Sequence, residues 1–197
     1  MAAIPGLPDA DAIKSKGFTI TGALIFAERK YGADARAKVI TALDPETRRL
    51  VERSVLASEW VPLRNQVAIY EAIDRTLGSG DLKLCFEIGR FTCDHEMTTI
   101  NRIFLKFGSL EQWMRMGAGM WNRYYSRGRL EVLGFTKTEG TIVIRDFNPI
   151  SKAFCNDLAG WFHRTSEVGG ARKVTMDHPD CLLDGADGCR YVGRWER

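Results

Sequence analysis

Four residues near the C-terminus constrain the fold of this chain more than any other feature of its sequence. Cys155, His178, Cys181 and Cys189 together offer three sulfur ligands and one imidazole nitrogen. Three thiolates and one imidazole form a tetrahedral set that Zn²⁺ prefers in closed sites, where no position remains open for water. If the four side chains converge, the sequence predicts a zinc ion that stabilises the fold rather than one that catalyses a reaction.

The spacing of the last three residues indicates how they could converge on a β-hairpin. Cys181 and Cys189 are equidistant from Gly185, so a symmetric hairpin places them opposite each other, with Cβ atoms about 4.5–5.5 Å apart. They could then share a metal or form a disulfide. His178 precedes Cys181 by an odd number of residues, which puts the two side chains on opposite faces of a regular strand. Pro179 favours a β-bulge, whose extra residue restores both side chains to one face.

The fourth residue is predicted to come from a helix. Cys155 shares an apolar stripe with Leu158, Ala159 and Phe162, at the i, i+3, i+4 and i+7 positions of a core-facing surface. A metal bound by all four residues would attach this helix to the hairpin. The alternative is that the cysteines and the histidine only pack in the core, because buried cysteines are common.

Length and composition indicate one globular domain over residues 1–197, with residues 1–11 as a flexible lead. A chain of 197 residues can bury a core without a disulfide or a metal. An apolar content of 45% and a charged content of 27% indicate neither a disordered nor a membrane-spanning chain, and a net charge of +3 does not indicate a nucleic-acid partner. The N-terminus has no signal-peptide pattern and the cysteines suit a reducing compartment, so we expect a cytoplasmic location.

Hydrophobic periodicity predicts an α+β fold, with an N-terminal helical bundle packed on an antiparallel sheet of about four strands. Helical periodicity changes to strand alternation near Gly128. Ser109 and Gln112 predict a capping box, and Asp44-Pro45 predicts another helix start. The other predicted helices span about 19–31, 65–77, 81–107, 110–126 and 149–168, and the predicted strands span about 130–136, 141–147, 172–183 and 188–195.

The residues around the predicted metal site carry a resemblance to a known family. They are His178-Pro-Asp-Cys181, Gly185, Gly188, Cys189 and Tyr191, with Cys155 in a helix that contains Gly160 and Trp161. This stretch resembles the 4-vinyl reductase domain, whose family includes predicted hydrocarbon-binding proteins and the sensory domains of phenol-responsive bacterial transcription activators. The resemblance implies zinc held by the helical cysteine, a glutamate and both hairpin cysteines. His178 stands at the place of that glutamate and is itself a competent zinc ligand.

The resemblance also implies a fold shared with haem-nitric-oxide-binding domains and TRAPP vesicle-tethering subunits, with an apolar cavity between helices and sheet. A helical stripe suited to such a cavity consists of Trp113, Gly117, Trp121 and Tyr124. We expect Phe135 and Ile144 to form the floor, and Tyr124 or His95 to be a polar anchor for a small apolar or aromatic ligand. The alternative is that the stripe is only part of the core.

Haem is not expected in that cavity. The haem-binding relatives carry a Tyr-x-Ser-x-Arg element, and Tyr124, Ser126 and Gly128 occupy the same spacing here without the arginine. No nucleophile elbow, phosphate loop or dinucleotide fingerprint is present either, so we do not expect an enzyme. Two functions remain. The chain is a small-molecule sensor acting through a protein partner, or a homodimeric interaction module similar to the TRAPP subunits and without a ligand.

Overall fold

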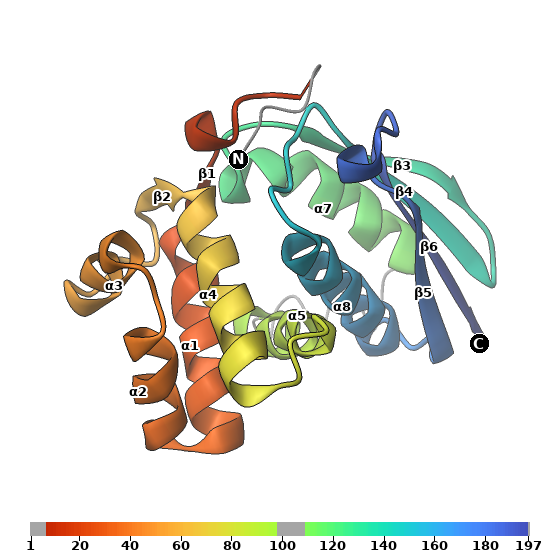
Figure 1. Cartoon of the computed structure of the whole chain (residues 1–197). Helices are drawn as coiled ribbons and strands as arrows, with labels where there is room; N and C mark the ends of the chain where they lie inside the picture. The colour runs from red at the N-terminus through yellow and green to blue at the C-terminus, as the bar shows by residue number, and fades with distance from the viewer. Residues whose placement is uncertain (1–6, 98–108, 197) are drawn as a thin grey trace.

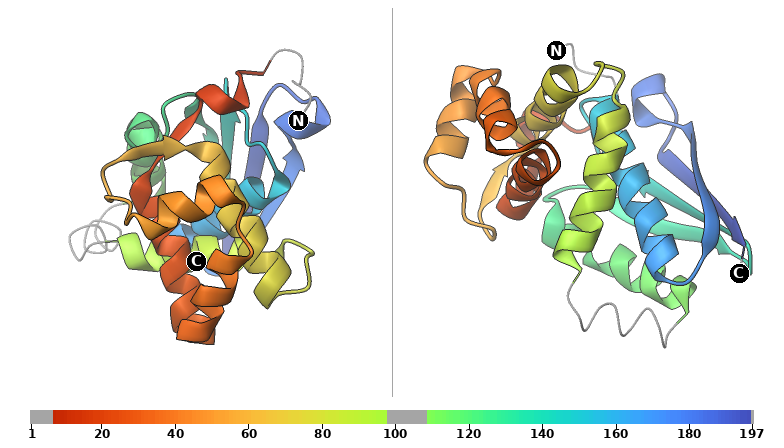
Figure 2. Two further views of the ribbon diagram at one scale, coloured as in Figure 1. Left: turned by 60° about the vertical axis from the view of Figure 1, so that its left-hand side comes forward. Right: turned by 90° about the horizontal axis from the view of Figure 1, so that it is seen from below.

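The computed structural model describes residues 7–97 and 109–196, which form an α+β fold. Helices from the N-terminal half lie on one side and an antiparallel sheet from the C-terminal half lies on the other (Figure 1). Between them lie α5 (Lys83–Glu96) and α8 (Lys152–Val168), as the view from below also shows (Figure 2). The sheet packs on α8 and, at β3 (Arg129–Phe135), on α7 (Leu110–Tyr124).

The N-terminal elements agree with the sequence where capping or apolar periodicity is strong. The helices α1 (Gly17–Tyr31), α3 (Pro45–Glu52) and α4 (Leu63–Leu77) were all expected. Asp44 caps α3 by accepting hydrogen bonds from the backbone of Glu46 and Thr47 at 2.9 and 3.0 Å. Elements without such signals were missed, namely α2 (Ala33–Thr41), the paired strands β1 (Lys14–Lys16) and β2 (Trp60–Pro62), and η1 (Ala10–Ala12), a 3-10 helix in the expected flexible lead.

A helix was expected over residues 81–107. The structure has α5 up to Glu96, and positions 98–108 lie outside the described residues. The next helix, α7 (Leu110–Tyr124), begins with the predicted capping box, because Ser109 and Gln112 each accept the other's backbone N–H at 3.1 Å. It ends earlier than expected because Tyr125 is extended and bridges Ser15 near β1. Of the helices formed by residues 7–97 and 109–196, none is long and apolar enough to cross a membrane.

In the described part of the chain, four antiparallel strands form the main sheet in the order β3-β4-β6-β5. They are β3 (Arg129–Phe135), β4 (Glu139–Arg145), β5 (Arg172–Asp180) and β6 (Cys189–Glu196). All were predicted, although β5 stops at Asp180 because the short 3-10 helix η2 (Leu182–Asp184) and Gly185, at φ +86°, form the turn. Along β6 the buried residues alternate with exposed or partly exposed ones, so one face of the sheet packs against the helices.

Two glycines allow α5 and α8 to pack with their backbones in contact. A Cβ atom at Gly89 would lie 1.8 Å from the carbonyl oxygen of Asp157, and one at Gly160 would lie 1.9 Å from that of Phe86. No other residue type fits at such distances without displacing a helix. This crossing sets the position of α8, which carries residues of both candidate sites described below.

Candidate metal centre and ligand cavity

The hairpin of β5 and β6 has the bulge that the sequence predicts. Asp177 pairs with Val192 and Asp180 pairs with Arg190, so β5 contains one more residue than β6 between these pairs. The extra residue lies at His178-Pro179. Extending the register from Asp180 and Arg190 brings Cys181 opposite Cys189, with Gly185 at the centre of the turn.

The four predicted ligands meet at the start of α8. Their candidate ligand atoms all lie within 4.8 Å of one another. The Sγ atom of Cys181 is 3.8 Å from that of Cys155 and 3.8 Å from that of Cys189. Sulfur atoms at the corners of a tetrahedron with Zn–S bonds of about 2.3 Å are about 3.8 Å apart. All cysteines of the chain lie in the described ranges and are free, so the disulfide alternative does not apply.

Burial of these residues fits a bound metal better than simple packing. The three cysteines are buried, and the His178 ring stacks on Tyr191 with centroids 4.5 Å apart. The Nε2 atom of His178 is buried and has no hydrogen-bond partner within the described ranges. A buried nitrogen without a partner is costly, and a metal bond would satisfy it. The donor set and its geometry therefore fit Zn²⁺.

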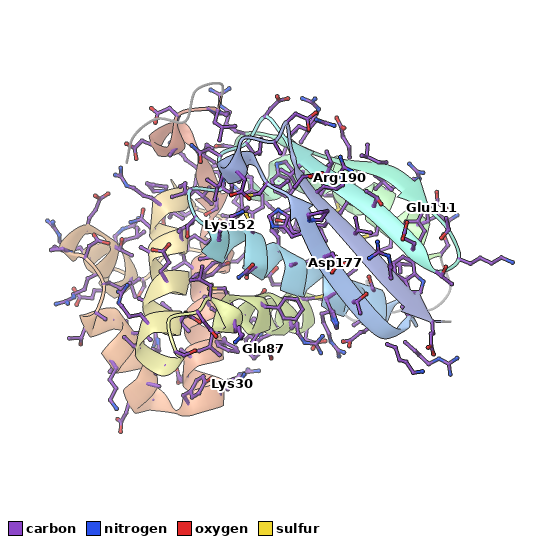
Figure 3. All side chains as sticks on the ribbon, turned by 45° about the vertical axis from the view of Figure 1, so that its right-hand side comes forward. Lys30, Glu87, Glu111, Lys152, Asp177 and Arg190 are labelled. Atoms are coloured by element: carbon purple, nitrogen blue, oxygen red, sulfur yellow. The ribbon has the colours of Figure 1, made fainter. Side chains whose placement is uncertain are left out.

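Neighbouring donors favour a thiolate at the centre. Thiol hydrogen bonds from Cys155 and Cys189 lower the pKa of Cys181, and the Lys152 ammonium also hydrogen-bonds its sulfur. The backbone N–H of Leu182 donates to Cys189 Sγ at 3.5 Å. Lys152 lies at the N-terminal end of α8, beside the turn of the hairpin (Figure 3). Such outer contacts offset the negative charge that three thiolates bring to a metal.

A separate cavity of about 150 Å³ lies beside α7. The predicted stripe of Trp113, Gly117, Trp121 and Tyr124 lines it, so these four residues are brought together. Facing them are residues of α1, α4, α5 and α8. Further apolar lining comes from Phe18, Met97, Met114, Met116, Met120, Leu130, Leu158, Trp161 and Phe162.

The expected floor and one expected anchor are wrong. Phe135, Ile144 and His95 are not among the described residues that line the cavity. Phe135 packs on Trp195, Ile144 is buried in the sheet core, and His95 is exposed and stacks on Phe91. The physical reason is that α8 covers the inner face of the sheet, so side chains of α8 take the place that the sequence assigned to the sheet.

The real floor is polar and was missed. Asp157 of α8 is 5% exposed and Glu96 of α5 is partly buried, and both line the cavity. Burial raises the pKa of Asp157 to about 8. Burial, with a smaller contribution from the Asp157 charge, raises the pKa of Glu96 to about 8. The signal available in the sequence was an aspartate three residues after Phe154, on the apolar face of the helix.

No protein-family model matches the sequence, and no curated protein matches it. Solved structures are similar in fold. An H-NOX protein from S. oneidensis in the Fe(II)NO ligation state matches with a TM-score of 0.69 and 12% identity, over 92% of this chain and 99% of that one. The Fe(II) unliganded H-NOX protein from K. algicida matches with a TM-score of 0.67 and 12% identity, over 92% of this chain and 97% of that one. An oxygen-binding H-NOX domain related to soluble guanylate cyclases matches with a TM-score of 0.64 and 13% identity, over 92% of this chain and 95% of that one.

At such low identity these matches show the fold alone, and they support the expected relation to haem-nitric-oxide-binding domains. The described lining residues do not fit a haem. They include no histidine, lysine or arginine, so none of them offers an axial imidazole or a cation for the propionates. Cys93 lines the cavity, but burial raises the pKa of its thiol to about 12 and it contacts the Thr165 hydroxyl. Ser126, the serine at the spacing of the Tyr-x-Ser-x-Arg element, has its hydroxyl oxygen occupied by the backbone N–H of Lys14 at 2.8 Å.

Proposed function

We propose that this chain is a small-molecule sensor domain of the 4-vinyl reductase and hydrocarbon-binding type, and that it binds its ligand without catalysing a reaction. The cavity beside α7 is the observation that carries the proposal. Its volume of about 150 Å³ suits one ring, since an apolar cavity of similar size engineered in another protein binds benzene. Aromatic side chains from α7 and α8 would surround the hydrocarbon part of the ligand.

Zinc has a structural role in this proposal. Cys155, His178, Cys181 and Cys189 would hold the ion, which supplies four bonds between α8 and the hairpin. The same helix presents Asp157, two residues after Cys155 in sequence, to the cavity. The metal would thereby support the cavity wall without contacting the ligand.

The output of the sensor requires a surface that responds to the ligand. Helix α7 lines the cavity with one face and exposes another, on which Arg115, Gly119 and Asn122 lie. We propose that a ligand shifts α7 and that a cytoplasmic protein partner, or a second copy of the chain, reads this change.

Gly117 offers a direct test of the cavity. A Cβ atom placed at Gly117 or at Gly119 meets no atom of the described residues within 4 Å, but only Gly117 lines the cavity. Gly117→Leu should therefore fill the cavity and abolish the thermal shift caused by toluene, phenol or benzylamine, while the variant stays folded. The measurement is thermal denaturation at increasing ligand concentration.

Gly119→Leu is the matched control, because it adds the same side chain to an exposed position of the same helix. It should retain the ligand-induced shift. If none of these ligands stabilises the wild-type protein, or if Gly117→Leu binds them as well as wild type does, the sensor proposal fails and the interaction-module alternative is favoured.

A further inference from the structure

The floor of the cavity is built to receive a hydrogen-bond donor. Asp157 Oδ1 is buried and has no hydrogen-bond partner in residues 7–97 and 109–196, although it belongs to a residue that is 95% buried and lines the cavity. An unpartnered buried carboxyl oxygen costs free energy in the empty protein. A ligand that donates to this atom would remove that cost.

A chain of hydrogen bonds orients the carboxyl group from behind. Gln66 Nε2 donates to the Tyr70 hydroxyl oxygen at 2.7 Å. The hydroxyl hydrogen of Tyr70 then remains for Asp157, with which Tyr70 is hydrogen-bonded. The Tyr70 hydroxyl is thus oriented to donate to Asp157, and the Oδ1 atom of Asp157 remains for a ligand.

The charges around the cavity have one sign. Glu96 provides a second carboxyl group, and among the described lining residues no lysine, arginine or histidine balances either acid. Burial raises the pKa of Glu96 to about 8, which is the response of an acid that lacks a cation. Trp113, Trp121 and Trp161 line the same space, and the faces of such rings attract cations.

We propose that the ligand is a small amine that binds as an ammonium ion, with its nitrogen at Asp157 and Glu96 and its hydrocarbon part against the aromatic side chains of α7. This inference rests on the proposed ligand-binding function and names the class of ligand. A carboxylate would place a third acid beside two others. A hydrocarbon would leave Oδ1 of Asp157 without a donor, and a neutral alcohol would donate without supplying a charge.

Binding of an ammonium ion should displace protons from the floor. The titratable groups that interact with Glu96 are Asp157 of α8, Tyr70 of α4, Cys93 of α5, Tyr124 of α7 and Tyr125. Burial raises the pKa of Glu96 to about 8, so this acid would lose a proton when the cation arrives. Calorimetry at pH 7 in buffers of different ionisation enthalpy should therefore detect net proton release for benzylamine.

The experiment compares the binding of four ligands of similar size to the wild-type protein. They are a cation, benzylamine; a neutral hydrogen-bond donor, benzyl alcohol; a hydrocarbon, toluene; and an anion, benzoate. Benzylamine should bind at least roughly tenfold more tightly than benzyl alcohol or toluene, and benzoate should not bind. Asp157→Asn and Glu96→Gln should each reduce this preference. The matched controls Asp34→Asn, at an exposed acid, and Glu111→Gln, at a partly exposed one, lie outside the cavity and should keep the preference for benzylamine (Figure 3 labels Glu111).

The outcomes separate this inference from the proposed function. Binding of toluene or benzyl alcohol as tight as that of benzylamine, abolished by Gly117→Leu, overturns the amine and leaves the cavity in place as a ligand site. Absence of proton release on benzylamine binding also overturns the amine, and this readout does not depend on whether Asp157→Asn folds. Binding of none of the four ligands overturns both proposals.

Discussion

At the level of single residues, His178 and Asp157 share one property. Each has a buried polar atom without a hydrogen-bond partner in the described part of the chain, the Nε2 atom of His178 and the Oδ1 atom of Asp157. Such atoms are rare in folded proteins because each one costs about 1–3 kcal/mol. In this protein the first lies among three thiols and the second lines a cavity, so a metal and a ligand respectively would satisfy them.

The acids of the cavity floor predict a pH dependence of stability. The folded pKa of Asp157 and that of Glu96 are raised to about 8, above the values of unfolded chains near 4. The folded state therefore binds more protons than the unfolded state between these pH values. The contribution of these acids to stability is fully present below about pH 4 and is lost as the pH rises to about 8, by at most about 1.4 kcal/mol per pH unit for each acid.

Urea denaturation of the ligand-free protein between pH 5 and pH 8.5 measures this effect. His163 has a pKa lowered chiefly by burial and acts in the opposite direction, so the useful quantity is the difference between wild type and Asp157→Asn. Asp157→Asn should gain stability relative to wild type as the pH rises. A constant difference over this range would contradict the raised pKa of Asp157.

At the level of secondary-structure elements, α8 has a different partner on each side. Gly89 and Gly160 bring it into backbone contact with α5, and the cluster of candidate metal ligands joins its Cys155 to three residues of the hairpin of β5 and β6. The cavity wall depends on both contacts because Asp157, Leu158 and Trp161 lie on this helix.

Zinc should stabilise the contact between α8 and the hairpin. Cys181→Ser removes the central thiolate and should lower both zinc content and stability, the latter by on the order of 2–4 kcal/mol, because the remaining core can still fold. His178→Glu should retain zinc, since glutamate is the residue that the resemblance implies at this place. Native mass spectrometry and thermal denaturation measure the two effects.

Cys85→Ala is the control for Cys181→Ser. Cys85 is buried but lies outside the metal centre, so the variant should keep one zinc ion per chain. Purified wild-type protein that is folded and metal-free, with reactive thiols, would be incompatible with a structural zinc.

The two glycines at the crossing of α5 and α8 should not tolerate replacement by a residue with a side chain. Gly89→Ala and Gly160→Ala each force a methyl group against a carbonyl oxygen of the other helix, and we expect a loss of about 3 kcal/mol or more. Gly119→Ala, in an exposed position of α7, should instead stabilise by up to about 1 kcal/mol. Chemical denaturation of the three variants compares them. Equal stabilities would show that the helices separate easily at this crossing.

At the level of the whole molecule, the fold resembles H-NOX domains over 92% of the chain, while the cavity has its own chemistry. A common fold places α7 beside the other helices and encloses a space. The side chains that line this space decide what it accepts, and here they are acids and aromatic rings rather than groups suited to haem.

Local patterns by themselves determined much of this protein. The capping box at Ser109, the cap at Asp44 and strand alternation after Gly128 predicted elements within a few residues of their observed ends. The hairpin symmetry about Gly185 and the bulge at Pro179 could also be predicted from the sequence, because the pairing register of a hairpin depends on residues close in sequence. The convergence of the four candidate metal ligands was therefore predictable from the chain alone.

Only the tertiary structure decided what forms the floor of the cavity. Asp157, Glu96 and Tyr70 come from three helices, and their meeting depends on the close crossing of α5 and α8 at Gly89. Periodicity shows which face of a helix is buried but not which helix it will face. For that reason the sequence placed Phe135 and Ile144 at the floor, whereas the crossing puts α8 there and turns an isolated aspartate into the polar end of the cavity.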